Sequence, residues 1–122
     1  ALQDVLEKML TPNNIAFDFE EIEMEERVPQ VIEISLYRIA QELLNNVVKH
    51  SKASSVSVML TKRNNFITMI FEDNGKGFSS NQKNEGIGMT SLNSRVKMVN
   101  GEIKFETEEG SGTMAIVKIP LT

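Results

Sequence analysis

The residues of this chain best suited to chemistry occur in two places, one behind an apolar run and one on a predicted helix. Asp73 comes shortly after the apolar run from Phe66 to Phe71 and is followed at once by the glycines Gly75 and Gly77. A carboxylate at the end of a buried strand is costly to desolvate unless it meets a polar partner. The sequence therefore predicts a polar partner for the Asp73 side chain.

The second group lies on the segment from Pro29 to His50, the strongest predicted helix in the chain. With about 100° of rotation per residue, four polar side chains fall within roughly 60° of Glu42, and apolar residues fill the opposite half of the helix. The four are Arg38, Asn45, Asn46 and Lys49. A solvated face is the ordinary interpretation of such a stripe. Two adjacent asparagines weaken that interpretation, because asparagine has poor helix propensity.

This polar stripe has the residue types of a site for a phosphate-bearing ligand. The carboxamide oxygen of Asn46 is a good ligand for Mg²⁺, which usually also keeps waters and substrate phosphates. Glu42, one turn earlier, could take a proton, and Lys49 could neutralise phosphate charge. The stripe is thus a candidate site for metal-assisted phosphate chemistry.

Six of the seven glycines form three pairs of the G-x-G type. The pairs are Gly75 with Gly77, Gly86 with Gly88, and Gly110 with Gly112. One pair is a weak signal because turns account for most of them, but three pairs in one short domain are a stronger one. The polar stretch 78–85 between the first two pairs predicts a small mobile lid. A helix that begins behind Gly88 would point its N-terminal amides at this loop and would favour an anion there.

The elements that must position these residues follow from hydrophobic periodicity. Helical spacing predicts helices over about 2–10, 29–50 and 89–99, and alternation predicts strands over about 15–21, 55–61, 66–72, 103–105 and 114–119. Residues 62–65 are expected to form the turn of the first hairpin. The expected fold class is α+β, a two-layer α/β sandwich in which about three helices cover one face of a mixed, mainly antiparallel sheet.

Composition limits the classes of function. A chain of 122 residues with 40% hydrophobic content predicts a single domain over 1–122. A net charge of −4 gives no broad cationic field for nucleic acid or for an anionic membrane. The absence of cysteine and the single histidine exclude disulfides, thiolate metal sites and a histidine-rich zinc site, and they fit a reducing cytoplasm. Neither a P-loop nor a dinucleotide-binding fingerprint occurs. Because the chain opens at Ala1 inside a predicted helix, we expect a fragment cut from a longer protein.

Four motifs resemble, in order and spacing, the four boxes of the GHKL ATPases. Residues 42–50 resemble the N box, 73–78 the G1 box, 86–89 the G2 box and 110–113 the G3 box. Within that family the chain is most similar to the catalytic, ATP-binding domain of bacterial sensor histidine kinases, from about Val31 to its C-terminus. The short lid and the sequence from Tyr37 to Glu42, with Lys49, His50 and Ser51 behind it, resemble the short-lid kinases of the nitrate-sensing and lipid-fluidity-sensing type.

The resemblance implies a Bergerat ATP-binding fold and a role for each matching side chain. Asp73 would accept a hydrogen bond from the adenine amino group, and Thr113 would lie near the adenine with it. Asn46 would ligate Mg²⁺ between the phosphates, and Lys49 would contact a phosphate oxygen. Glu42 would act as the base for the attacking nucleophile, or would polarise that base.

The glycines of two boxes would have backbone roles. Gly75 and Gly77 would let the backbone approach the adenine, whereas Gly86 and Gly88 would hinge the lid over the phosphates. The implied cofactors are ATP and Mg²⁺, and the implied location is the cytoplasm, without contact of this domain with nucleic acid or a membrane.

The implied reaction is transfer of the ATP γ-phosphoryl group to a histidine on a dimerisation and phosphoacceptor domain outside this chain, with a response regulator downstream. His50 is rejected as the acceptor, because it lies one step past Lys49 on the nucleotide-binding helix and no acidic residue follows it. The isolated chain is therefore not expected to phosphorylate itself.

Two alternative functions share these motifs. A GHKL protein-serine kinase of the anti-sigma-factor type would carry the same boxes and phosphorylate a serine on a separate protein. A nucleotide-gated ATPase module would need transducer segments that 122 residues cannot hold. The sequence upstream of Ala1 would discriminate the first alternative, because a helical hairpin that carries a histidine would exclude it.

Overall fold

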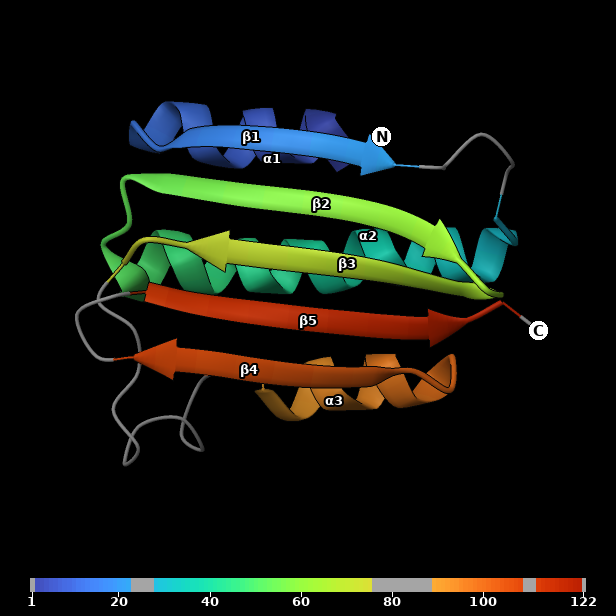
Figure 1. Ribbon diagram of the computed structural model, residues 1–122. Coiled ribbons are helices and arrows are strands. Elements are labelled where there is room, and N and C mark those ends of the chain that lie inside the picture. Colours follow the sequence, from blue (N-terminus) through green and yellow to red (C-terminus); the bar gives the residue numbers. More distant parts are fainter. Residues whose placement is uncertain (1, 23–27, 76–88, 109–111, 122) are drawn as a thin grey trace.

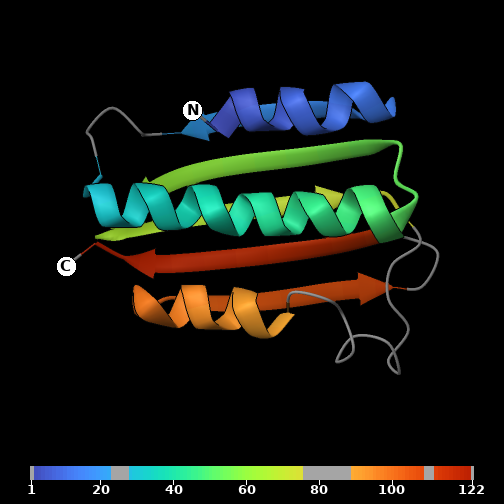
Figure 2. The same ribbon diagram turned by 180° about the vertical axis from the view of Figure 1, so that it is seen from behind.

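The chain folds into two layers, one of helices and one of strands (Figure 1). The computed structural model describes residues 2–22, 28–75, 89–108 and 112–121. Helices α1 (Leu2–Leu10), α2 (Gln30–Asn46) and α3 (Met89–Met98) all lie on the same face of the sheet, which is plain from behind (Figure 2). This arrangement confirms the predicted α+β sandwich.

The sheet has five strands in the order β1-β2-β3-β5-β4. Their bounds are β1 Ala16–Ile22, β2 Ser55–Arg63, β3 Phe66–Asp73, β4 Glu102–Glu108 and β5 Gly112–Pro120. Only the pairing of β1 with β2 is parallel, because α2 connects those two strands and crosses the sheet. The sheet is therefore mixed and mainly antiparallel, as the sequence predicts.

The core lies between α2 and the central strands. Ile39 and Leu44 of α2 are fully buried, and so are Ile67 and Met69 of β3. Every second residue is buried from Val56 to Leu60 in β2 and from Ile67 to Phe71 in β3, which is the alternation that predicts these strands. The packing of α2 on the central strands therefore holds the helix that carries Glu42 and Asn46 in place.

Helix α2 ends in an unusual turn. The predicted helix over 29–50 has the correct extent, but its last turn, η2 (Val47–Ser51), is π-helical and ends at Lys52 with φ 55°. Single π-helical turns occur often at functional sites, where they change the direction of side chains. Here the change comes directly after Asn46.

The turn of the first hairpin is shorter than the sequence predicts. Residues 62–65 were expected to form it, but Lys62 and Arg63 pair with β3, so only Asn64 and Asn65 remain in the turn. Both asparagines have positive φ, 51° and 66°, as a type I′ turn requires. The twist of that turn matches the twist of the strands, which explains why the pairing continues to Arg63.

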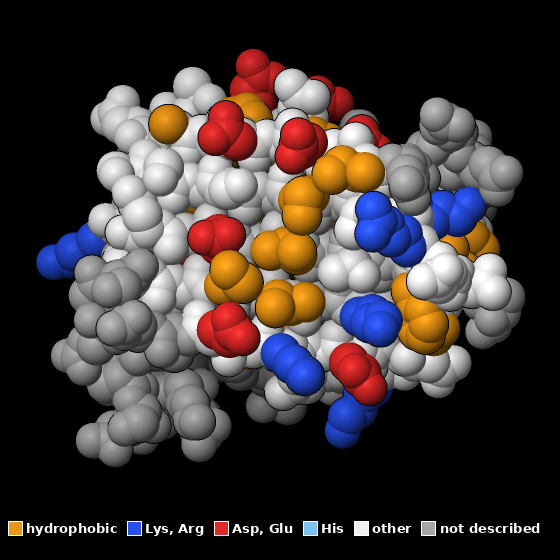
Figure 3. Space-filling view, viewed as in Figure 1, with side chains coloured by type: hydrophobic (Ala, Val, Ile, Leu, Met, Phe, Trp, Pro, Cys, Tyr) orange, Lys and Arg blue, Asp and Glu red, His pale blue; other side chains and the backbone are white. Residues whose placement is uncertain are grey.

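In the ranges that the structure describes, no helix covers the other face of the sheet, and Figure 3 shows the side chains of this face. Met59, Ile70 and Ile116 follow one another across β2, β3 and β5 and form a half-buried apolar row in its middle. Charged side chains surround this row in the figure. In the part of the chain that the structure describes, none of the helices has the length and hydropathy of a membrane span.

Candidate functional site

Asp73 lies at the carboxyl end of β3, with Val56 of β2 and Thr113 of β5 as its neighbours across the sheet. Side chains alternate along a strand, so Asp73 shares the helix-facing side with the buried Phe71. A partly buried carboxylate therefore stands at the end of the core, as the sequence predicts.

The polar partners of Asp73 are backbone groups. The Gly75 N–H donates to Asp73 Oδ1 at 2.8 Å. Burial raises the pKa of Asp73, and hydrogen bonds from the backbone of Gly75 and Thr113 oppose that rise only in part. Desolvation thus has a larger effect than hydrogen bonding, which leaves room for another donor to stabilise the carboxylate.

Gly112 keeps the start of β5 close to Asp73. Its φ is +102°, and a Cβ at this position would lie 2.1 Å from the carbonyl oxygen of Asp73. Only glycine fits both the conformation and the space. The sequence shows the third glycine pair, but it did not reveal that Gly112 supports Asp73 itself.

Three of the predicted site residues line one cavity. Asn46 from the end of α2, Asp73 from β3 and Thr113 from β5 surround a space of about 30 Å³. The other lining residues are apolar: Leu43, Val47, Phe71, Phe105 and Ala115. Asn46, Asp73 and Thr113 thus converge from three different elements on one small cavity, whose exposed surface is almost wholly apolar.

Glu42 and Lys49 lie beside this cavity and do not line it. Glu42 is one turn before Asn46, and its Oε1 accepts a hydrogen bond from Nε of Arg95 in α3 at 2.7 Å. Lys49 is exposed in η2, one turn after Asn46. Both side chains are therefore on the helical segment that bounds the cavity, one turn to either side of Asn46.

The remaining predicted residues divide in two. Gly75 is buried and bonded to Asp73. Gly77, Gly86, Gly88 and the predicted lid lie outside the described residues.

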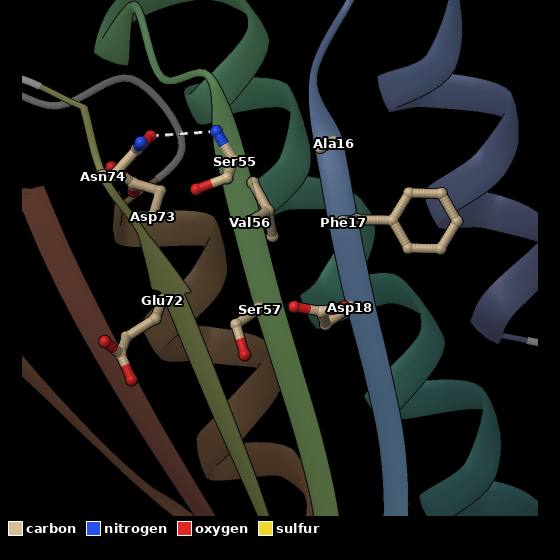
Figure 4. Close-up of a pocket in the computed structure, with 9 residues that line it drawn as sticks. All are labelled: Ala16, Phe17, Asp18, Ser55, Val56, Ser57, Glu72, Asp73 and Asn74. Carbon is tan, nitrogen blue, oxygen red and sulfur yellow. Dashed lines mark hydrogen bonds between the residues drawn. The ribbon is translucent and has the colours of Figure 1, made fainter.

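Asn74 fixes the backbone next to Asp73 (Figure 4). Its Oδ1 accepts hydrogen bonds from the backbone N–H groups of Ser54 and Ser55 at 2.8 and 2.9 Å. Its Nδ2 donates to Ser54 Oγ at 2.8 Å. The sequence predicts no separate role for Asn74. Its position directly after Asp73 is the feature that could have indicated one.

A larger cavity of about 240 Å³ lies at the same end of the sheet, beside β1, β2 and β3 (Figure 4). Its lining includes the carboxylates Asp18, Glu72 and Asp73, and no lysine or arginine is among the described lining residues. Like charges repel, so this cavity disfavours a phosphate-bearing ligand despite its size. The smaller cavity, next to Asn46, is the better candidate.

The donor set fits a cation only when the ligand supplies further donors. Among the described residues, no group of three or more His, Cys, Asp and Glu side chains could hold a metal ion. Asn46 offers one neutral oxygen. Mg²⁺ bound to phosphates and waters needs only one or two protein ligands, so it fits Asn46, whereas a cage made of protein alone does not.

A family model supplies an independent view of the chain. The model described as "Histidine kinase-, DNA gyrase B-, and HSP90-like ATPase" matches residues 31–122. The signal transduction histidine-protein kinase/phosphatase DegS of Brevibacillus brevis is 40% identical over 109 residues, which cover 88% of this chain and 28% of that protein. Sensor histidine kinase LiaS of Bacillus subtilis is 41% identical over 91 residues, which cover 74% of this chain and 25% of LiaS. The chain thus spans about a quarter of the length of these relatives.

Solved structures share the fold. The catalytic domain of histidine kinase ThkA, in a nucleotide-free form, aligns with a TM-score of 0.80 at 18% identity and covers 99% of this chain and 90% of that one. The histidine kinase domain of the blue-light activated kinase from Erythrobacter litoralis aligns with a TM-score of 0.78 at 21% identity and covers 98% and 59%. At these identities the likeness concerns the fold alone.

Proposed function

Because the chain belongs to the histidine kinase-, DNA gyrase B- and HSP90-like ATPase family, we propose that it is the ATP-binding catalytic domain of a bacterial sensor histidine kinase. The observation that carries the proposal is the cavity shared by Asn46, Asp73 and Thr113. Around it lie a partly desolvated hydrogen-bond acceptor, apolar side chains and a carboxamide of the type that binds hard cations. The described residues form only part of such a site, because a cavity of about 30 Å³ is far smaller than the pockets that hold ligands of nucleotide size.

The proposed reaction moves the γ-phosphoryl group of ATP to a histidine on a dimerisation and phosphoacceptor domain elsewhere in a longer kinase, from which a response regulator then receives it. Residues 1–122 would be a single catalytic domain of that kinase. The relatives described above have histidine-kinase names, which supports a histidine acceptor over a serine acceptor. A cytoplasmic location and the short-lid, nitrate-sensing or lipid-fluidity-sensing type complete the proposal.

Each side chain has a role that its position supports. Asp73 accepts the adenine amino group, with Thr113 beside it, since both line the cavity. Asn46 holds Mg²⁺, whose charge, when the ion is bound, neutralises the phosphates. Lys49 contacts a phosphate oxygen, because it is exposed one turn beyond Asn46.

Three further roles concern the reacting groups and the loop around them. Glu42 acts as the base, or polarises it, one turn before Asn46. Gly75 and Gly77 admit the backbone to the adenine. Gly86 and Gly88 hinge the lid.

Calorimetric titration of the chain with ATP tests the adenine role. Asp73→Ala removes the acceptor and should weaken binding on the order of 10- to 100-fold, because a hydrogen bond to a charged group contributes about 1.5–3 kcal/mol. Glu72→Ala is the matched control: Glu72 precedes Asp73, points to the opposite face and lines the larger cavity. Unchanged affinity in Asp73→Ala would contradict the adenine role, and a loss in Glu72→Ala would move the site to the larger cavity.

The same titration, repeated with and without Mg²⁺, tests the metal role. Mg²⁺ should raise the ATP affinity of the unaltered chain, and Asn46→Ala should abolish that gain because the protein ligand is gone. Asn45→Ala, at the exposed neighbouring position, should keep it. An Asn46→Ala chain that still responds fully to Mg²⁺ would show that Asn46 does not hold the ion.

A further inference from the structure

We propose that Arg95 is a positioning residue for phosphoryl transfer, because it holds the carboxylate of Glu42 in place from helix α3. The inference rests on the function proposed above, in which Glu42 serves the attacking nucleophile. Arg95 was not singled out by any motif, and it lies 53 residues from Glu42 in the sequence.

The contact itself is short and directional. Nε of Arg95 donates to Oε1 of Glu42 at 2.7 Å, within the range of strong charge-assisted hydrogen bonds. The two side chains are 34% and 20% exposed, so the pair is partly shielded from water. A guanidinium also has a rigid, planar set of donors, which fixes the direction of a carboxylate better than a flexible ammonium does.

Both ends of the pair stand on rigid supports. Leu43 and Leu44 follow Glu42 directly and are 5% and 0% exposed. On α3, Leu92 and Val96 are 1% and 2% exposed, so the helix is packed against the core one turn before Arg95 and at the residue directly after it. Functional groups that are held by packed helices keep their geometry better than groups on loops. Arg95 therefore transmits the position of α3 to the Glu42 side chain.

The Arg95–Glu42 pair lies close enough to the candidate site to affect the proposed reaction. Glu42 lies one turn before Asn46, which lines the cavity, and α3 begins at Met89, directly after the second glycine pair. A base must lie within hydrogen-bond reach of the proton that it takes, and small misplacements are costly in rate. The Arg95–Glu42 pair thus joins the candidate base to helix α3.

A purely structural role makes a different prediction. Partly exposed ion pairs add little to stability, and α2 and α3 are each held by their own buried apolar side chains. If Arg95 serves only to hold the helices together, its loss should change melting temperature and leave turnover per folded molecule unaltered. If it positions Glu42, kcat should fall while the melting temperature and the KM for ATP change little.

The test uses the full-length kinase that carries this chain, with phosphorylation of its acceptor histidine as the readout. Arg95→Gln should lower kcat by about 10- to 100-fold with the KM for ATP unchanged, since a misplaced catalytic group costs on the order of 10²-fold. Arg95→Lys, which keeps the charge and loses the fixed geometry, should recover part of that loss. Lys97→Gln is the matched control, because it removes a positive charge from an exposed position of the same helix.

Three further results decide the question. A wild-type rate in Arg95→Gln beside an inactive Glu42→Gln would overturn the positioning role and leave the proposed function intact. Exchange of the two residues, Glu42→Arg with Arg95→Glu, restores an ion pair; recovered transfer in this double variant would show that the pair is only structural. Wild-type transfer in Glu42→Gln would overturn the role proposed for Glu42, and the role of Arg95 with it.

Discussion

At Asp73, ATP binding and stability depend on pH in opposite directions. Burial raises the pKa of the folded carboxyl above its unfolded value, so the native state binds this proton more tightly. The contribution of Asp73 to stability is therefore fully present below the unfolded pKa and is lost as the pH rises through the folded pKa. The ionised form is the stronger acceptor for an adenine amino group, so the contribution to ATP affinity weakens as the pH falls through the same folded pKa.

We predict that ATP affinity falls on acidification more steeply in the unaltered chain than in Asp73→Asn. The asparagine has no proton to gain, whereas the protonated carboxyl presents an O–H to the amino group. Calorimetric titrations between about pH 7.5 and pH 4.5 measure both proteins, and the difference between them isolates Asp73 from the titration of the phosphates. Identical pH dependence in the two proteins would count against adenine recognition by Asp73.

Single residues of the site differ in how well the sequence predicts them. Asp73 and Asn46 are visible locally, one as a carboxylate behind an apolar run and one on a polar stripe of a helix. Arg95 has no local signal, because an arginine at this place on a helix is typical of any solvated face. Its partner is known only when α2 and α3 are packed side by side on the sheet.

At the scale of the elements, periodicity predicts every α-helix and strand that the structure describes, and the errors concern their ends. The first hairpin turn contains two residues instead of four, and the last turn of the long helix is π-helical. A hairpin turn must match the twist of the two strands that it joins. The turn propensities of single residues do not specify this match. Neither error moves Asn46 or Asp73 away from the cavity.

The two-residue turn supplies a prediction at this scale. Asn65→Gly should raise the free energy of unfolding by about 0.5 kcal/mol, because glycine accepts the positive φ of a type I′ turn without steric cost. Urea denaturation measures the change, with Asn65→Ala as a control that should lose stability. ATP affinity should be unaltered, since Asn65 lies at the opposite end of β3 from Asp73. Lower stability in Asn65→Gly would mean that the asparagine makes a contact that matters more than its backbone conformation.

At the scale of the whole molecule, the proposed function makes the chain depend on another domain for the acceptor. It spans about a quarter of the length of the relatives DegS and LiaS. In the proposed function the acceptor histidine belongs to the remaining part of the kinase. Positioning the acceptor against the γ-phosphoryl group then requires a second domain to dock beside the cavity.

We predict that the isolated chain binds ATP and does not phosphorylate itself. Incubation with γ-labelled ATP should leave the chain unlabelled, and addition of the phosphoacceptor domain of the parent kinase should give an acid-labile label on that domain. The variant His50→Gln serves as a control, because it removes the one histidine of the chain. Acid-labile label on the chain that disappears in His50→Gln would show that the rejection of His50 is wrong.

The sequence by itself determined the elements, the fold class and the residues capable of chemistry, because periodicity, glycine pairs and residue type are local properties of a chain. Only the tertiary structure decided which of those residues meet. Asn46, Asp73 and Thr113 come from α2, β3 and β5 and share a cavity because the ends of these elements coincide when α2 packs on the sheet. The same packing brings Arg95 to Glu42 and makes Gly112 indispensable beside Asp73. Contacts between distant segments depend on packing and register, which no local pattern specifies.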